Sequence, residues 1–65
     1  MSAIEQKCID IINAEFLRQE YEDIVENAKH ALSHGLNGLA LAYAISAHKV
    51  MQKREQIINR LIFGV

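Results

Sequence analysis

Two histidines have a spacing that metal sites use. His30 and His34 are four residues apart, so a helix would place both imidazoles on one face. Ala31 stands where the zinc-protease motif HExxH carries its glutamate base, and Gly35 follows the second histidine at once. His48 could complete a ligand set only from a second copy of the chain. We therefore interpret His30 and His34 as complements to a helix dipole, and they remain the metal candidates of this sequence.

The single cysteine, Cys8, is the other group that could do covalent chemistry. It lies beside Lys7 in an apolar stretch that lacks a histidine to activate the thiol. We interpret it as a buried small apolar residue. The sequence also lacks a glycine-rich phosphate loop and a nucleophile turn. It therefore predicts a non-enzymatic protein without a cofactor, and a small metal- or thiol-dependent enzyme is the second alternative.

These residues must be positioned by helices. Ser2 and Glu5 fit a capping box, and no glycine or proline interrupts the chain before Gly35. We expect Gly35 to end the first helix in the left-handed conformation and Asn37 to cap the second, which Gly64 ends.

The chain is therefore predicted to be all-α and a single domain over residues 1–65. Its two helices, at about 3–34 and 38–63, form an antiparallel hairpin in which residue i lies opposite roughly residue 71 − i. The apolar face of the first helix switches sides between Phe16 and Leu17. This helix must therefore meet different partners at its two ends, or bend near residues 13–18.

The chain is too short to bury a large core on its own. At 65 residues, with one cysteine, oligomerisation is the remaining means of stabilisation. Two hairpins associating as a dimeric four-helix bundle would cover the apolar faces that one hairpin leaves open. The residues predicted at this dimer interface are Ile4, Cys8, Ile11, Ile12, Phe16, Leu41 and Ile45.

The charges divide between the two halves of the chain. Residues 1–34 hold seven acids and three bases, which is −4, and residues 35–65 hold four bases and one acid, which is +3. A basic stripe on the second helix contains Lys49, Lys53, Gln56 and Arg60. An acidic stripe on the first contains Glu15, Gln19, Glu22 and Glu26. The basic stripe could contact nucleic acid and the acidic one could dock a basic partner, although solvated helix faces have the same pattern.

Arg54 stands at the centre of the apolar face of the second helix. A guanidinium does not enter an apolar seam unpaired. We expect it to pair with an acid of this chain or its mate, such as Glu15, Glu20 or Asp10, and so to fix the register. The alternative is that its side chain extends to water.

The chain resembles small accessory and regulatory proteins of temperate phages and plasmids, of which the Rop-like RNA-binding hairpin is one. The resemblance lies in its length, its proline-free hairpin and the implied dimer. The resemblance implies a regulatory protein and transfers no site residues. The longest apolar run is far below the roughly 20 residues that span a membrane, so we expect a cytoplasmic protein, in the host cytoplasm if phage-encoded. Its expected partners are itself and a second protein; the first alternative is a nucleic-acid-binding dimer.

Overall fold

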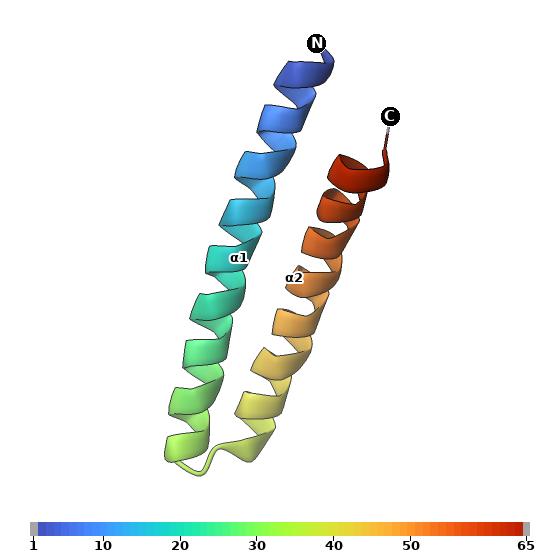
Figure 1. The fold of residues 1–65 in the computed structure, drawn as a ribbon. Coiled ribbons are helices and arrows are strands. Elements are labelled where there is room, and N and C mark those ends of the chain that lie inside the picture. The colour runs from blue at the N-terminus through green and yellow to red at the C-terminus, as the bar shows by residue number, and fades with distance from the viewer. Residues whose placement is uncertain (1, 65) are drawn as a thin grey trace.

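The protein is a two-helix antiparallel hairpin. The computed structural model describes residues 2–64, in which α1 (Ala3–Ser33) and α2 (Asn37–Phe63) lie side by side along their length (Figure 1). The rod measures 49 × 15 × 14 Å, with both termini at one end and the loop at the other. The predicted all-α hairpin is confirmed. In the described part of the chain, neither helix is long and apolar enough to cross a membrane.

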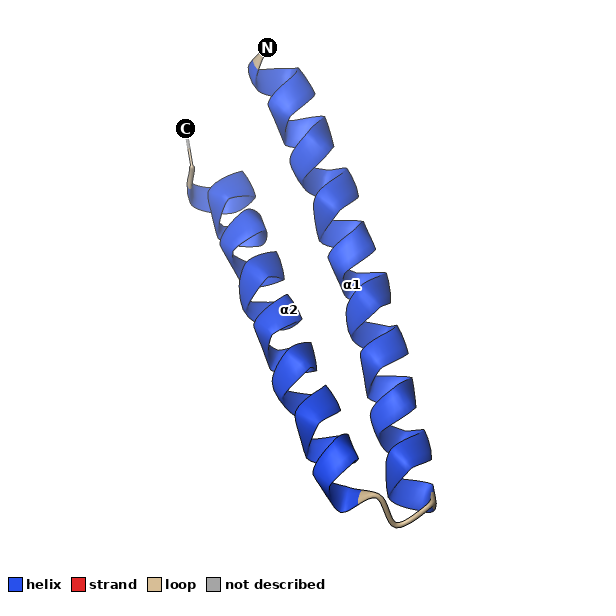
Figure 2. Ribbon diagram, turned by 180° about the vertical axis from the view of Figure 1, so that it is seen from behind, coloured by secondary structure: helices blue, strands red, loops and turns tan. Residues whose placement is uncertain are grey.

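The start of α1 is capped as its sequence predicts. The Ser2 hydroxyl oxygen accepts a hydrogen bond of 3.1 Å from the backbone N–H of Glu5. The helix then continues without interruption through residues 13–18, as Figure 2 shows. The helix is therefore not broken there, and the switch of apolar face between Phe16 and Leu17 takes place on one continuous helix.

A glycine turn ends α1. Gly35 has a φ of 73°, the left-handed conformation that glycine adopts without strain. Its N–H donates to the Leu32 carbonyl at 3.0 Å, and the N–H of Leu36 donates to the Ala31 carbonyl at 2.9 Å. These two bonds form a Schellman motif, which satisfies carbonyls that the helix end would leave unpaired.

The start of α2 differs from the expectation that Asn37 caps it. Leu36 occupies the N-cap position without a side-chain hydrogen bond, and Asn37 is already helical. The turn explains this shift, because it places the Leu36 carbonyl where it accepts the N–H of Ala40 at 3.0 Å. At the other end Gly64 closes the helix, as predicted, by donating to the Arg60 carbonyl at 2.8 Å.

The two helices meet along one seam. We define it by the buried and half-buried residues that follow one another along each helix at alternating spacings of three and four. In α1 these are Asp10, Ala14, Leu17, Tyr21, Ile24, Ala28 and Ala31, and in α2 they are Ala40, Tyr43, Ala47, Val50, Arg54, Ile57 and Leu61. This spacing is the heptad pattern of a coiled coil. A hydrogen bond joins Asp10 to Arg60, whose numbers sum to 70, close to the predicted register.

The seam contains few large buried side chains. Among the described residues, the buried apolar ones are four alanines and Val50, and no large side chain is fully buried. Within residues 2–64, twelve large apolar residues remain exposed: Ile4, Ile9, Ile11, Ile12, Phe16, Leu32, Leu36, Leu39, Leu41, Ile45, Ile62 and Phe63. The hairpin exposes 4998 Å², whereas a compact monomer of 7.4 kDa exposes about 4,200 Å². The hairpin therefore carries about 800 Å² more surface than a compact fold of its mass.

Candidate interaction surfaces

An apolar groove runs along one side of the seam in the loop half of the hairpin. Its volume is about 400 Å³. Residues of both helices line it: Tyr21, Val25, Ala28, Lys29 and Leu32 from α1, and Ala44, Ala47, His48 and Met51 from α2. Val25 and Leu32 flank the seam at one heptad position of α1, and Ala44 and Met51 flank it at one position of α2. Both helices therefore contribute an additional apolar stripe on the same side.

The groove belongs to a face that runs the whole length of the hairpin. Residues seven apart keep the same side of a heptad seam. We call this side the groove face and define it by four stripes: Ile4, Ile11, Arg18, Val25 and Leu32 of α1; Cys8, Glu15, Glu22 and Lys29 at its margin toward the outer edge of α1; Ala44, Met51 and Ile58 of α2; and Leu41, His48, Glu55 and Ile62 of α2. Beyond the groove it contains large side chains that the hairpin leaves exposed, with Ile4 at 75%, Ile11 at 58% and Ile62 at 65%. The face is apolar at both ends and charged near its middle.

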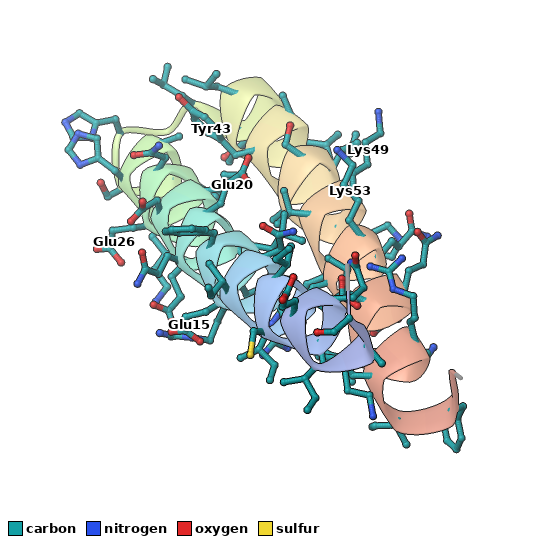
Figure 3. All side chains as sticks on the ribbon, turned by 90° about the horizontal axis from the view of Figure 1, so that it is seen from above. Glu15, Glu20, Glu26, Tyr43, Lys49 and Lys53 are labelled. Carbon is teal, nitrogen blue, oxygen red and sulfur yellow. The ribbon has the colours of Figure 1, made fainter. Side chains whose placement is uncertain are left out.

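The seven predicted dimer residues are all exposed, but they do not share one face. Ile4, Ile11 and Leu41 lie on the groove face, with Cys8 at its margin, whereas Ile45 shares its heptad position with Gln52 and lies on the outer edge of α2. Phe16 lies across the seam, on the side of His30, which lines a second groove of about 180 Å³ beside the loop. Ile12 shares its heptad position with Glu26, which Figure 3 shows on the outer edge of α1.

The acidic and basic stripes occupy opposite outer edges of the hairpin. Figure 3 shows Glu15 and Glu26 on the outer edge of α1 and Lys49 and Lys53 on the outer edge of α2. The fourth member of the basic stripe, Arg60, is engaged within the chain by an ion pair. The two stripes therefore do not hold the helices of one chain together.

Arg18 neutralises part of the acidic stripe. Its Nη1 lies 2.5 Å from Oε1 of Glu22, and its Nε donates to Oε1 of Glu15 at 3.0 Å. Hydrogen bonding to this guanidinium lowers the pKa of the Glu15 carboxyl, and the two carboxylates raise the pKa of Arg18. All three side chains remain substantially exposed, so the cluster is accessible to a partner.

Asp10 is the buried polar residue of the seam, at 3% exposure, and the sequence suggested it only as one of several possible partners of Arg54. Its Oδ1 accepts from Arg60 Nη2 at 2.6 Å and its Oδ2 from Arg60 Nε at 3.0 Å. Gln6 Nε2 donates to Oδ1 at 3.2 Å. The Arg60 hydrogen bonds lower the pKa of Asp10 more than burial raises it. The fold-back relation, in which residue i lies opposite roughly residue 71 − i, could have indicated this pair, because the numbers 10 and 60 sum to 70.

Arg54 lies in the seam, as predicted, but its pairing differs from the expectation. Its Nε donates to the backbone carbonyl oxygen of Ala14 at 3.2 Å, across the seam. Among the described residues Arg54 forms no ion pair with a carboxylate of this chain, and a pairing with an acid of the mate stays a prediction. The reason within this chain is the side of the helix and not the level, because Glu15 stands between Ala14 and Leu17 but on the outer edge of α1, where it pairs with Arg18.

The candidate chemical residues make local contacts. The ring centroids of His30 and His34 are 4.4 Å apart. Nδ1 of His34 lies 3.0 Å from the His30 carbonyl oxygen and 3.2 Å from the Ser33 hydroxyl oxygen. Residues 2–64 contain no group of three or more side chains that could hold a metal ion. Cys8 is exposed in the hairpin. Its interpretation as a buried residue is wrong for the single chain, because its side of α1 points away from α2.

The arrangement thus offers apolar and charged surfaces for association. The chain matches no protein-family model, no curated protein and no solved structure.

Proposed function

We propose that this protein is a non-enzymatic, homo-oligomeric interaction module, a dimer of helical hairpins with an accessory or regulatory role carried out through protein contacts. The observation that carries the proposal is the apolar surface that one hairpin leaves uncovered. The excess of about 800 Å² over a compact monomer equals what one partner contributes to a standard protein interface. Association would therefore bring the chain to the exposure of an ordinary folded protein.

The composition of the seam supports the same proposal. A core of four alanines and one valine buries little apolar surface for a chain of 65 residues. Large apolar side chains are present, but most lie outside the seam. A second copy would bury part of them, and Ile9 and Phe16, across the seam from the groove face, would remain for a second protein.

The alternative functions have less support. A nucleic-acid contact through the basic stripe would have to share Arg60 with Asp10, which binds it through two hydrogen bonds. A metal- or thiol-dependent activity would depend on Cys8, His30 and His34, and the thiol lies on α1 more than five helical turns from the histidines.

Thermal unfolding at several protein concentrations tests the proposal. A dimer that unfolds to separate chains has a melting temperature that rises with concentration. We expect this rise over a hundredfold range, followed by circular dichroism at the helical signal. A constant melting temperature together with the mass of one chain by light scattering would overturn the proposal.

The catalytic alternative has its own test. A triple variant, Cys8→Ser, His30→Ala and His34→Ala, removes the thiol and both candidate ligands while leaving the seam intact. We expect it to retain the concentration-dependent melting and the biological activity of the native chain. Loss of biological activity with unchanged melting would favour the enzyme.

A further inference from the structure

We propose that the second copy packs on the groove face in parallel, with both loops at the same end, so that α1 of each copy lies on α2 of the other. This inference rests on the homo-oligomer proposed above and adds the face and the orientation of the dimer.

The occupant of the groove face is a second copy because the face complements itself. It carries apolar residues at both ends, and a two-fold axis along the hairpin sets each end against its equivalent. Within one hairpin, two residues lie at the same level when their numbers sum to about 71. In the parallel dimer the same relation holds between α1 of one copy and α2 of the other. Ile11 lies near the level of Ile58 and Ile62 of the second copy, and Val25 lies near its Ala44. Apolar groups thus meet apolar groups at both ends.

The net charges of the two halves favour the parallel orientation as a long-range effect, because Lys49, Lys53 and Arg60 lie across the seam from the groove face. A two-fold axis along the hairpin brings residues 1–34, with a net charge of −4, beside residues 35–65 of the second copy, with a net charge of +3. A two-fold axis across the hairpin would instead bring α1 beside α1 and α2 beside α2, and so place like charges together. Complementary charge fixes orientation and register at an interface even where it adds little affinity.

The charged middle of the groove face has partners in this orientation. Arg18 lies within about two residues, or roughly 3 Å along the axis, of the level of Glu55 of the second copy. Glu22 lies at nearly the same level as His48 of the second copy. In the antiparallel orientation α1 of one copy stacks on α1 of the other. The same stripe of each copy would then face its equivalent, and Arg18 would approach Arg18 of the second copy. The parallel dimer therefore brings opposite charges together in the middle of this face, where Arg18 also pairs with Glu15 and Glu22 of its own chain.

Distances between spin labels test the orientation. A single label is attached at His34→Cys, beside the loop, or at Phe63→Cys, at the open end, each in a Cys8→Ser background whose mass is verified first. The parallel dimer places like labels within about 30 Å at both ends, because bundle helices lie 8–10 Å apart. Distances approaching the 49 Å length of the hairpin would overturn the parallel arrangement and leave the homo-oligomer standing. The mass of one chain would overturn both proposals.

Mixing two charge variants tests the pairing. A two-fold dimer contains two equivalent contacts between residue 18 of one copy and residue 55 of the other. In a homodimer of the Arg18→Glu variant, or of the Glu55→Arg variant, both contacts bring like charges together, and we expect each change to weaken dimerisation up to about five-fold. A mixed dimer of the two variants restores an opposite-charge pair in both contacts. Native mass spectrometry of an equimolar mixture should therefore show mixed dimers above the share of a random mixture. A random distribution would overturn the pairing of Arg18 with Glu55, and a pair within one chain could not produce the expected excess.

Discussion

Ile11 and Ile12 are adjacent, identical and almost equally exposed, and the groove-face dimer requires that they behave differently. Ile11 is 58% exposed on the groove face, and Ile12 is 53% exposed on the outer edge of α1. Replacing isoleucine by alanine removes three carbon groups, each worth about 0.8 kcal/mol when buried. If the dimer buries the exposed 58% of Ile11, the loss is about 1.4 kcal/mol in each copy.

Two copies per dimer double this loss. The Ile11→Ala dimer should therefore dissociate about 100-fold more readily than the native one, because about 2.8 kcal/mol corresponds to two factors of ten. Ile12→Ala should leave the dissociation constant within about two-fold of the native value. Helicity should be the same in both variants, because either change removes side chain that the hairpin leaves largely in water.

Isothermal dilution calorimetry of the three proteins measures these constants directly. The comparison controls for helix propensity, since the same substitution is made at neighbouring positions of one helix. Equal weakening by both substitutions would show that the interface includes the outer edge of α1. A loss confined to Ile12→Ala would refute the assignment of the groove face.

Three further predictions concern the hairpin. Arg54→Ala should lower the free energy of unfolding by about 1 kcal/mol through its lost hydrogen bond and packing, whereas Lys53→Ala should have almost no effect in chemical denaturation; equal effects would make Arg54 an ordinary surface charge. Because the pKa of Asp10 is lowered in the folded state, its ion pair stabilises the hairpin above the ordinary pKa of 3.8 and loses this effect as the pH falls through the lowered value. Asp10→Asn should therefore be less stable than the native chain at pH 7, with a difference that disappears on acidification, and a difference independent of pH would contradict the assignment. Gly35→Ala should destabilise by about 1 kcal/mol because its φ is 73°, whereas Gly38→Ala should stabilise by about 0.5 kcal/mol; melting temperatures that shift in the same direction would refute the role of the turn.

Local signals made most of the fold predictable. The Ser2 cap, the left-handed Gly35 and the end of α2 at Gly64 follow from residue types whose backbone preferences are strong. The start of α2 did not follow from such a preference. The Schellman turn fixed the carbonyl of Leu36 in the capping position, and so the hydrogen-bond geometry of the turn outweighed the capping propensity of Asn37.

The polar contacts of the seam were less predictable. The sequence placed Arg54 in the seam, but its bond to a backbone carbonyl depends on which side chains stand at its level. The fold-back relation places residue 61 opposite Asp10 and so brings Arg60 within one residue of its level, but this relation alone does not select Arg60 as the partner. Contacts between helices therefore require the structure even where the helices themselves do not.

The candidate surface was also only partly predictable. Helical periodicity showed that residues 4–16 carry an apolar face turned away from α2, which their exposure in the structure agrees with. Periodicity did not separate Ile11 from Ile12 and Phe16, because these directions become distinct only once the seam is known. The heptad positions of the seam divide this broad face into a groove side, an outer edge and an opposite side.

Sedimentation equilibrium of the native chain tests the central claim most directly, since self-association underlies both the proposed function and the orientation of the dimer. At micromolar concentrations we expect twice the mass of the 7.4 kDa chain, with dissociation to single chains on dilution. A mass of 7.4 kDa at every concentration, in a hairpin that still melts cooperatively, would contradict the account.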